Sequence, residues 1–270
     1  MLVIKQSNQD LDTRLILIYS VFQFRNIIYN LHVLTLSDLG VGLRPQNTDK
    51  LIDSQMFVLN AGDTNTRPTN EGRADEGQGD LNVDYAARLR TFLKVYDTPA
   101  EGDYQQFDLA SLGDCGTFPY GFVKEGEKPV SPCIFVKFNK IWDWTPTPID
   151  DDDLAELPQA VQDHYATQEN KGNVWINCAG RYAADQEALD GKMEYFPKSR
   201  AIPATYFPYT GGKEIGGNNY HSPLVAIKIT PNAAPGQLIH IECRAYFKNV
   251  IHNTKDKMGL VQFEVMINDN

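Results

Sequence analysis

The sequence predicts a mainly β protein, a sandwich of antiparallel strands with one or two short edge helices. Three observations carry this prediction. The 270-residue chain contains 20 Gly and 15 Pro, residues that mark turns between short strands. It also contains 13 Tyr and 13 Phe, and aromatic residues are enriched in strands. Finally, two segments near the C-terminus alternate apolar and polar residues with a period of two, which is typical of strands with one buried face.

The charge of the chain excludes some classes of partner. Lysine and arginine number 25, aspartate and glutamate number 35, and the formal net charge is −10 at pH 7. Nucleic acids and anionic lipids both require clustered basic residues. We therefore expect no nucleic-acid partner. Disorder is excluded as well, because hydrophobic residues make up 42% of the chain.

Residues 1–39 are interpreted as a divergent N-terminal segment without a reliable transmembrane helix. The apolar run at residues 15–24 is followed at once by Arg25, whereas a spanning helix needs about 20 mostly apolar residues. The run also lacks the small-residue cleavage site of a signal peptide.

A helix is predicted after the polar loop at residues 63–80. Asp84 suits its N-cap, and Pro99 lies just beyond its expected end. Apolar residues at helical spacing form one stripe, made of Tyr85, Leu89, Phe92, Leu93 and Tyr96. A second, short helix is predicted after the four acids at residues 150–153. Because the spacing of a calcium loop is absent there, we interpret these acids as helix-capping and solvated.

Strands are predicted at residues 133–138, 173–178, 224–230, 238–247 and 261–268. The alternation is clearest at 238–247. The inward residues of the last two strands are expected to be Ile239, Ile241, Cys243, Ala245, Phe247, Val261, Phe263, Val265 and Ile267. Such alternation describes antiparallel strands with one solvated face.

The four cysteines are Cys115, Cys133, Cys178 and Cys243, and they lack zinc-site spacing. Two disulfides formed in an oxidising compartment are one interpretation, and four buried thiols of a cytosolic protein are the other. Three pairings are possible. Cys115–Cys133 with Cys178–Cys243 is favoured, because the first pair brackets a turn-rich segment and the second lies in two apolar strands.

We predict no catalytic residue, no metal site and no cofactor. The sequence contains no G-x-S-x-G, H-E-x-x-H, P-loop or G-x-G-x-x-G motif. A hydrolase would need an activated nucleophile beside a base, and no such pair is evident among the five histidines.

An aromatic and proline-rich stretch occupies residues 202–211. Tyr206, Phe207, Pro208 and Tyr209 do not suit a central strand, because proline removes a ladder donor. Rigid exposed aromatics on a loop are typical anchors of protein interfaces. From the residues alone, a loop folded over the core is an equally good interpretation.

Several motifs together carry a family resemblance. They include CAGRY at residues 178–182, YFPYTG at 206–211 and IECRAY at 241–246, with further matches at 42–45, 92–96, 114–116, 120–121, 132–133, 139–141, 195–197, 219–220, 222–226 and 261–268. Over residues 40–270 the chain resembles the β subunit of the Na⁺/K⁺-transporting ATPase, its insect-type members in particular.

This resemblance implies an extracellular, immunoglobulin-like domain over residues 40–270 of a non-catalytic plasma-membrane pump subunit. Such a subunit assists folding, assembly and delivery of the catalytic α subunit, its partner, and modulates K⁺ and Na⁺ transport. The family's contact with α maps onto Tyr206, Phe207, Pro208, Tyr209, Thr210 and Gly211. The family's disulfides agree with the pairing Cys115–Cys133 and Cys178–Cys243. The α isoform is left open, as is the choice between a Na⁺/K⁺ and an H⁺/K⁺ pump.

The chain departs from the family in three respects. A third family disulfide is missing, and Gln105 stands where one of its cysteines would be. The chain has no Asn-x-Ser/Thr glycosylation site. The chain shows no match to the family's membrane helix, and residues 15–34 have no counterpart in the family. We expect that a truncated or mis-spliced gene product explains this departure. An alternative function retains the fold but does not involve the pump. The chain would then be a cell-adhesion or secreted module, with a β subunit on a neighbouring cell as partner.

Overall fold

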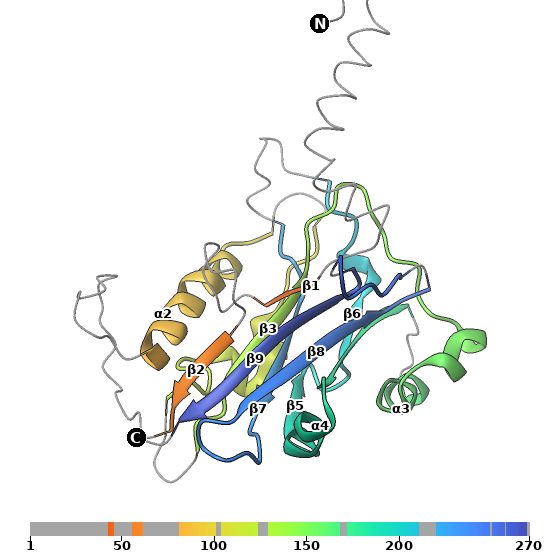
Figure 1. Ribbon diagram of the computed structural model, residues 1–270. Helices are drawn as coiled ribbons and strands as arrows, with labels where there is room; N and C mark the ends of the chain where they lie inside the picture. Colours follow the sequence, from red (N-terminus) through yellow and green to blue (C-terminus); the bar gives the residue numbers. More distant parts are fainter. Residues whose placement is uncertain are drawn as a thin grey trace, which may run out of the picture.

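The computed structural model describes residues 43–45, 56–61, 81–100, 104–123, 129–167, 172–210, 220–248, 250–256 and 258–268. Two β-sheets lie against each other, and helices flank them (Figure 1). One core joins the sheets, since buried residues of both belong to a single apolar cluster. The predicted β-sandwich is confirmed. The predicted boundary at residue 40 and the polar loop at 63–80 lie outside the described residues.

The four-stranded sheet has the order β1, β3, β7, β5, with all neighbours antiparallel. Its strands are β1 (Leu43–Pro45), β3 (Cys133–Phe138), β7 (Leu224–Ile229) and β5 (Met193–Phe196). Five of the six residues are buried in β3, and likewise in β7. A strand that is buried on both faces shows an apolar run instead of alternation, which explains the sequences CIFVKF and LVAIKI.

The five-stranded sheet has the order β2, β9, β8, β4, β6. Its strands are β2 (Met56–Asn60), β9 (Leu260–Asn268), β8 (Leu238–Tyr246), β4 (Asn173–Gly180) and β6 (Ala201–Pro203). β8 alternates buried and half-buried residues along its whole length, as predicted. The expectation of antiparallel strands throughout is wrong at one pair, because β2 runs parallel to β9. These two strands are far apart in sequence, so no tight hairpin imposes antiparallel pairing on them.

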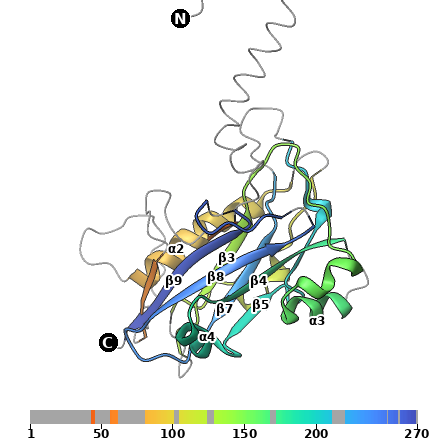
Figure 2. The same cartoon turned by 45° about the vertical axis from the view of Figure 1, so that its right-hand side comes forward.

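The described residues hold three α-helices, more than the one or two predicted: α2 (Leu81–Leu93), α3 (Gln159–Thr167) and α4 (Ala183–Leu189). Figure 2 shows α2 on the opposite side of the molecule from α3. Helix α2 begins three residues before Asp84, so the predicted N-cap is wrong. The predicted stripe is correct, because Leu89, Leu93 and Tyr96 are buried in the core. None of the described helices has the length and apolarity required to cross a bilayer.

The four acids at residues 150–153 lead into a short 3-10 helix, η3 (Asp151–Glu156), and Pro158 separates it from α3. The Nζ atom of Lys248 lies 2.5 Å from a carboxylate oxygen of Asp150 and 3.6 Å from one of Asp153. Within the described ranges, no group of three metal-ligating side chains occurs. Asp150 and Asp153 form a capping box on η3, as interpreted from the sequence, and both also pair with Lys248, which the sequence analysis did not predict.

Both predicted disulfides are present. Cys115, in the 3-10 segment η2 (Leu109–Gly116), is bonded to Cys133 at the start of β3. Cys178 and Cys243 face each other directly on β4 and β8, with Cα atoms 3.9 Å apart. No cysteine is free, so the interpretation as four thiols is wrong. The first disulfide ties η2 to β3 in the core, and the second ties β4 to β8.

Candidate protein interface

The predicted contact segment follows β6 as a short turn. Residues Ala204–Tyr206 form the 3-10 helix η4, which ends when the Phe207 N–H donates to the carbonyl of Ala204 at 3.0 Å. Pro203 and Pro208 lack main-chain donors, so this segment cannot continue the sheet. The expectation that it leaves the central sheet is confirmed. Gly211, the last residue of the predicted set, lies outside the described residues.

Tyr206 and Phe207 turn towards the body of the domain and are half-buried. The Phe207 ring meets Phe138 and Trp144 edge to face, with centroids 5.5 and 5.4 Å apart. The Tyr206 hydroxyl donates to the Gln106 carbonyl at 3.3 Å. Burial raises the pKa of Tyr206, so the phenol stays neutral at physiological pH. These two residues anchor the segment on the core.

Tyr209 belongs instead to a group of rings from four segments, which we name the aromatic surface cluster: Tyr104, Trp142, Tyr209 and Tyr220. The Tyr209 centroid lies 6.5 Å from that of Tyr104, 6.3 Å from that of Trp142 and 5.1 Å from that of Tyr220. Aromatic pairs at such separations add about 0.5–1.5 kcal/mol each beyond area burial. The cluster is thus a mutually supported group.

Main-chain hydrogen bonds fix the position of Tyr209. The Asp143 N–H donates to the Tyr209 carbonyl at 2.9 Å, and Trp142 pairs with Tyr209 in an isolated parallel bridge. Next along the chain, the Thr210 N–H donates to the Tyr104 hydroxyl at 2.9 Å. A site held by backbone bonds on both sides is preorganised, which lowers the entropy cost of binding a partner.

A cation lies over the cluster. The Nζ atom of Lys140 is 5.4 Å from the Tyr209 ring centroid and 5.8 Å from that of Tyr220. Ammonium groups at these distances are attracted by the ring quadrupole, by about 0.5–1 kcal/mol at exposed sites. Burial raises the pKa of both Tyr209 and Tyr220. Both phenols are therefore neutral at physiological pH.

The exposure of the cluster is uneven. Trp142 is 60% exposed, the largest exposed fraction among the large hydrophobic residues of the described chain, whereas Tyr220 is buried. Exposed tryptophan is a preferred anchor of protein interfaces. The sequence analysis did not assign Trp142, Tyr104, Lys140 or Tyr220 to the contact. The sequence signal that could have indicated this site is the W-D-W motif at residues 142–144.

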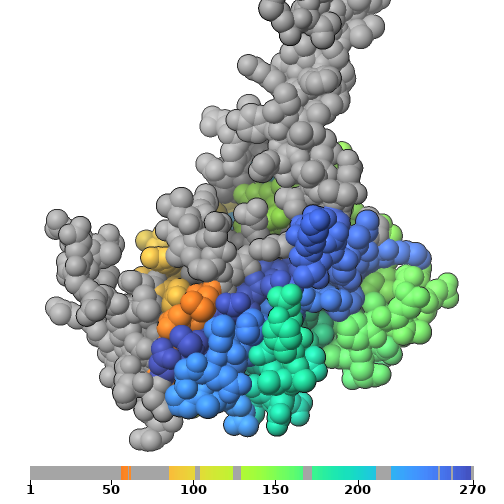
Figure 3. All heavy atoms as spheres, viewed as in Figure 1, coloured from red at the N-terminus to blue at the C-terminus, as the bar shows by residue number. Residues whose placement is uncertain are grey.

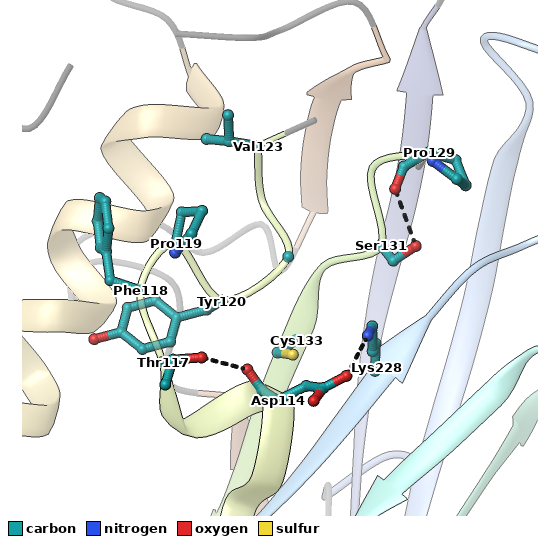
Figure 4. Close-up of a pocket in the computed structure, with 11 residues that line it drawn as sticks. Asp114, Thr117, Phe118, Pro119, Tyr120, Val123, Pro129, Ser131, Cys133 and Lys228 are labelled. Carbon is teal, nitrogen blue, oxygen red and sulfur yellow. Dashed lines mark hydrogen bonds and ion pairs between the residues drawn. The ribbon is translucent and has the colours of Figure 1, made fainter. Parts of the chain in front are cut away.

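A small cavity lies beside the first disulfide, with a volume of about 240 Å³ (Figure 4). Phe118, Pro119 and Tyr120 line one side of it. The Lys228 ammonium pairs with the Asp114 carboxylate at 3.0 Å. Cys133 lines the cavity but is held in the disulfide, so it forms no thiolate. This cavity does not assemble a nucleophile and a base.

The fold and the site together define a disulfide-bonded β-sandwich domain with an exposed aromatic surface cluster. The family described as the sodium/potassium ATPase beta chain matches residues 78–263, a span that contains the whole cluster. The chain therefore belongs to the sodium/potassium ATPase beta chain family, and the resemblance stated from the sequence is confirmed.

Similar proteins carry the same family name. The chain is 37% identical over 199 residues to sodium/potassium-transporting ATPase subunit beta-2 of Drosophila melanogaster, covering 71% of this chain and 54% of the relative. It is 34% identical to subunit beta-1 of the same organism, covering 53% and 44%. It is 29% identical to the probable subunit beta-3 of Caenorhabditis briggsae, covering 76% and 53%. The chain thus spans about half the length of these relatives.

Proposed function

We propose that this chain is a β subunit of a P-type Na⁺/K⁺-transporting ATPase that assists the folding, assembly and plasma-membrane delivery of the catalytic α subunit. In this role it modulates K⁺ and Na⁺ transport without catalysing a reaction. The observation that carries the proposal is the family match over residues 78–263. Relatives named as subunits of the same ATPase support it.

We further propose that the domain lies on the extracellular face of the plasma membrane. Its four cysteines are all bridged, and disulfides persist in oxidising compartments. The acidic balance of the chain agrees with a surface that binds neither nucleic acid nor anionic lipid.

The proposed contact with α is the segment predicted from the sequence, enlarged by its neighbours in space. Tyr206 and Phe207 hold the segment on the core, while Tyr209, Thr210 and Trp142 present surface to the partner. Interface energy concentrates in a few aromatic anchors on well-packed supports. The aromatic surface cluster has this organisation, with Trp142 exposed above the half-buried Tyr209.

Co-purification tests the proposal. The tagged chain is expressed in cells with a Na⁺/K⁺-ATPase α subunit, solubilised in detergent and recovered through the tag. We expect α to be recovered with the wild-type chain and recovered several-fold less with Tyr209→Ala. Tyr182→Ala is the matched control, because Tyr182 is 53% exposed and lies outside the cluster. Absence of α from the wild-type recovery, with the chain folded and oxidised, would refute the proposal.

A further inference from the structure

A polar groove crosses the outer face of the five-stranded sheet and shares no residue with the aromatic surface cluster. It has a volume of about 500 Å³. Its floor comes from β4 and β8, Arg181 and Gln186 lie on the α4 side, and Pro158 and Thr254 complete it. Figure 3 shows this face of the molecule, with α4 in teal and α3 in green.

The strand register explains why this face is hollow and charged. Ala179 lies opposite Glu242, and Asn177 lies opposite Arg244. The small side chain of Ala179 leaves space between longer neighbours. On β8 the period of two directs Glu242, Arg244 and Tyr246 outwards, since Cys243 and Ala245 are buried.

Glu242, the acidic side chain that lines the groove, is already paired with neighbouring side chains. One carboxylate oxygen of Glu242 accepts from the Arg244 Nε–H at 2.6 Å. The other accepts from the Gln262 amide at 2.6 Å. The Glu242 side chain is only 14% exposed. An incoming group therefore meets a carboxylate whose two oxygens are both engaged.

The other polar groups of the groove that can still bind a ligand are mainly hydrogen-bond donors. Arg244 uses Nε in its bond to Glu242, which leaves its two terminal nitrogens on a side chain that is 43% exposed. The Asn177 Oδ1 atom accepts from Arg200 at 2.7 Å, so the Asn177 amide nitrogen remains a donor. Arg181 reaches Gln262 only at 3.5 Å, the outer limit of a hydrogen bond.

We propose that this groove docks an extended, carboxylate-rich segment of a partner protein, with acidic side chains on Arg181 and Arg244. A guanidinium offers a planar fork that matches a carboxylate in two parallel bonds. The Asn177 amide supplies a donor for a main-chain carbonyl, and the half-buried Tyr246 supplies a surface for an apolar side chain. In a chain of net charge −10, two arginines beside one neutralised acid form a local site for negative charge.

Peptide binding tests this docking site. The purified full chain with both disulfides formed is titrated into fluorescein-labelled octaglutamate, and the dissociation constant is measured by fluorescence anisotropy. We expect Arg181→Gln and Arg244→Gln each to weaken binding about tenfold, which is the loss of one charge-assisted bond. Glu242→Gln should tighten binding several-fold, a gain that misfolding cannot produce. Arg88→Gln, on the exposed face of α2, is the control and should leave binding unchanged.

Three outcomes would overturn the proposal. The wild-type chain could fail to bind octaglutamate even at low salt. The three arginine variants, the Arg88→Gln control included, could weaken binding equally, which would indicate attraction to scattered surface charge. A heparin-derived oligosaccharide could bind in this groove while the peptide does not, which would assign it to a sulfated polysaccharide instead.

Discussion

The rings of Trp142 and Tyr209 meet edge to face with centroids 6.3 Å apart, and their main chains are paired by an isolated bridge. The two residues belong to loops that are distant in sequence. Trp142 is 60% exposed, whereas Tyr209 is half-buried against Tyr220. Trp142 therefore serves mainly contact with a partner, whereas Tyr209 both supports the fold and offers its exposed part to the partner.

Trp142→Ala should reduce recovery of the α subunit several-fold while leaving the domain folded. Loss of the Trp142 ring removes its pair with Tyr209, which costs about 0.5–1.5 kcal/mol of the free energy of unfolding and leaves the domain folded, whereas a tryptophan anchor contributes about 2 kcal/mol or more to an interface. Co-purification and thermal melting of the same preparation measure the two effects. Ile251→Ala, at an exposed residue outside the aromatic surface cluster, is the control. Undiminished recovery would remove Trp142 from the contact.

Phe207→Ala should instead act on stability. The substitution removes the edge-to-face contacts with Phe138 and Trp144 and leaves a cavity under the loop. Because Phe207 is only half-buried, we expect a loss of about 2–3 kcal/mol, at the low end for phenylalanine. Urea unfolding measures it. Phe118→Ala, at a residue that is 39% exposed, should cost less, and an equal cost would contradict the anchoring role of Phe207.

The two disulfides should differ in their contribution to stability. The sequence separation is 65 residues for Cys178–Cys243 and 18 for Cys115–Cys133. The chain-entropy model then gives about 4 kcal/mol for the longer loop and about 3 kcal/mol for the shorter. Denaturant unfolding of the two double Cys→Ala variants tests this order. A reversed order would show that packing at the sulfurs, rather than chain entropy, dominates.

His221 should make the domain less stable in mild acid. Its ring is fully buried, and Nδ1 accepts from the Phe107 N–H at 3.3 Å, which requires a neutral imidazole. Burial lowers the pKa of His221 and outweighs the opposite effect of the Thr98 and Val95 carbonyls.

The unfolded chain therefore takes up this proton near the ordinary histidine pKa of about 6.5, and the folded chain only at lower pH. The stabilisation is complete above about pH 6.5 and is lost as the pH falls towards the lowered folded pKa. Urea unfolding of wild type and His221→Gln between neutral and acidic pH checks this. Burial lowers the pKa of His164 and His252 as well, so the expected result is a shallower slope in the variant. Identical slopes would contradict it.

Gly121→Ala should be strongly destabilising. Gly121 has a φ of +74°, and an added Cβ would lie 1.9 Å from the Ser131 carbonyl oxygen. We expect a loss above about 3 kcal/mol, because backbone strain and a clash with a main-chain atom combine. Gly191→Ala is the matched control: its φ is +62°, but nothing lies within 4 Å of the added atom. Thermal melting should show about 1 kcal/mol for this control, and equal losses would exclude the clash as the cause.

Local patterns in the sequence determined much of this domain. The alternation at residues 238–247 located β8 and its inward face, because a strand with one solvated face must alternate. The apolar stripe of α2 was predicted in the same way from the spacing of its apolar residues. The residue at which the helix begins was not predicted correctly. The cysteine pairing was favoured from the strand assignments. The first two features depend on neighbours in the chain, whereas the pairing of Cys178 with Cys243 joins two strands that are far apart in sequence.

Apart from the disulfides, only the tertiary structure decided which distant residues meet. The parallel pairing of β2 with β9, the grouping of Tyr104, Trp142 and Tyr220 around Tyr209, and the groove over Ala179 all join segments far apart in sequence. Periodicity reports whether a residue is buried, but not against which residue it is buried. That choice follows from the connections between strands and from the packing of the two sheets, which no local pattern encodes.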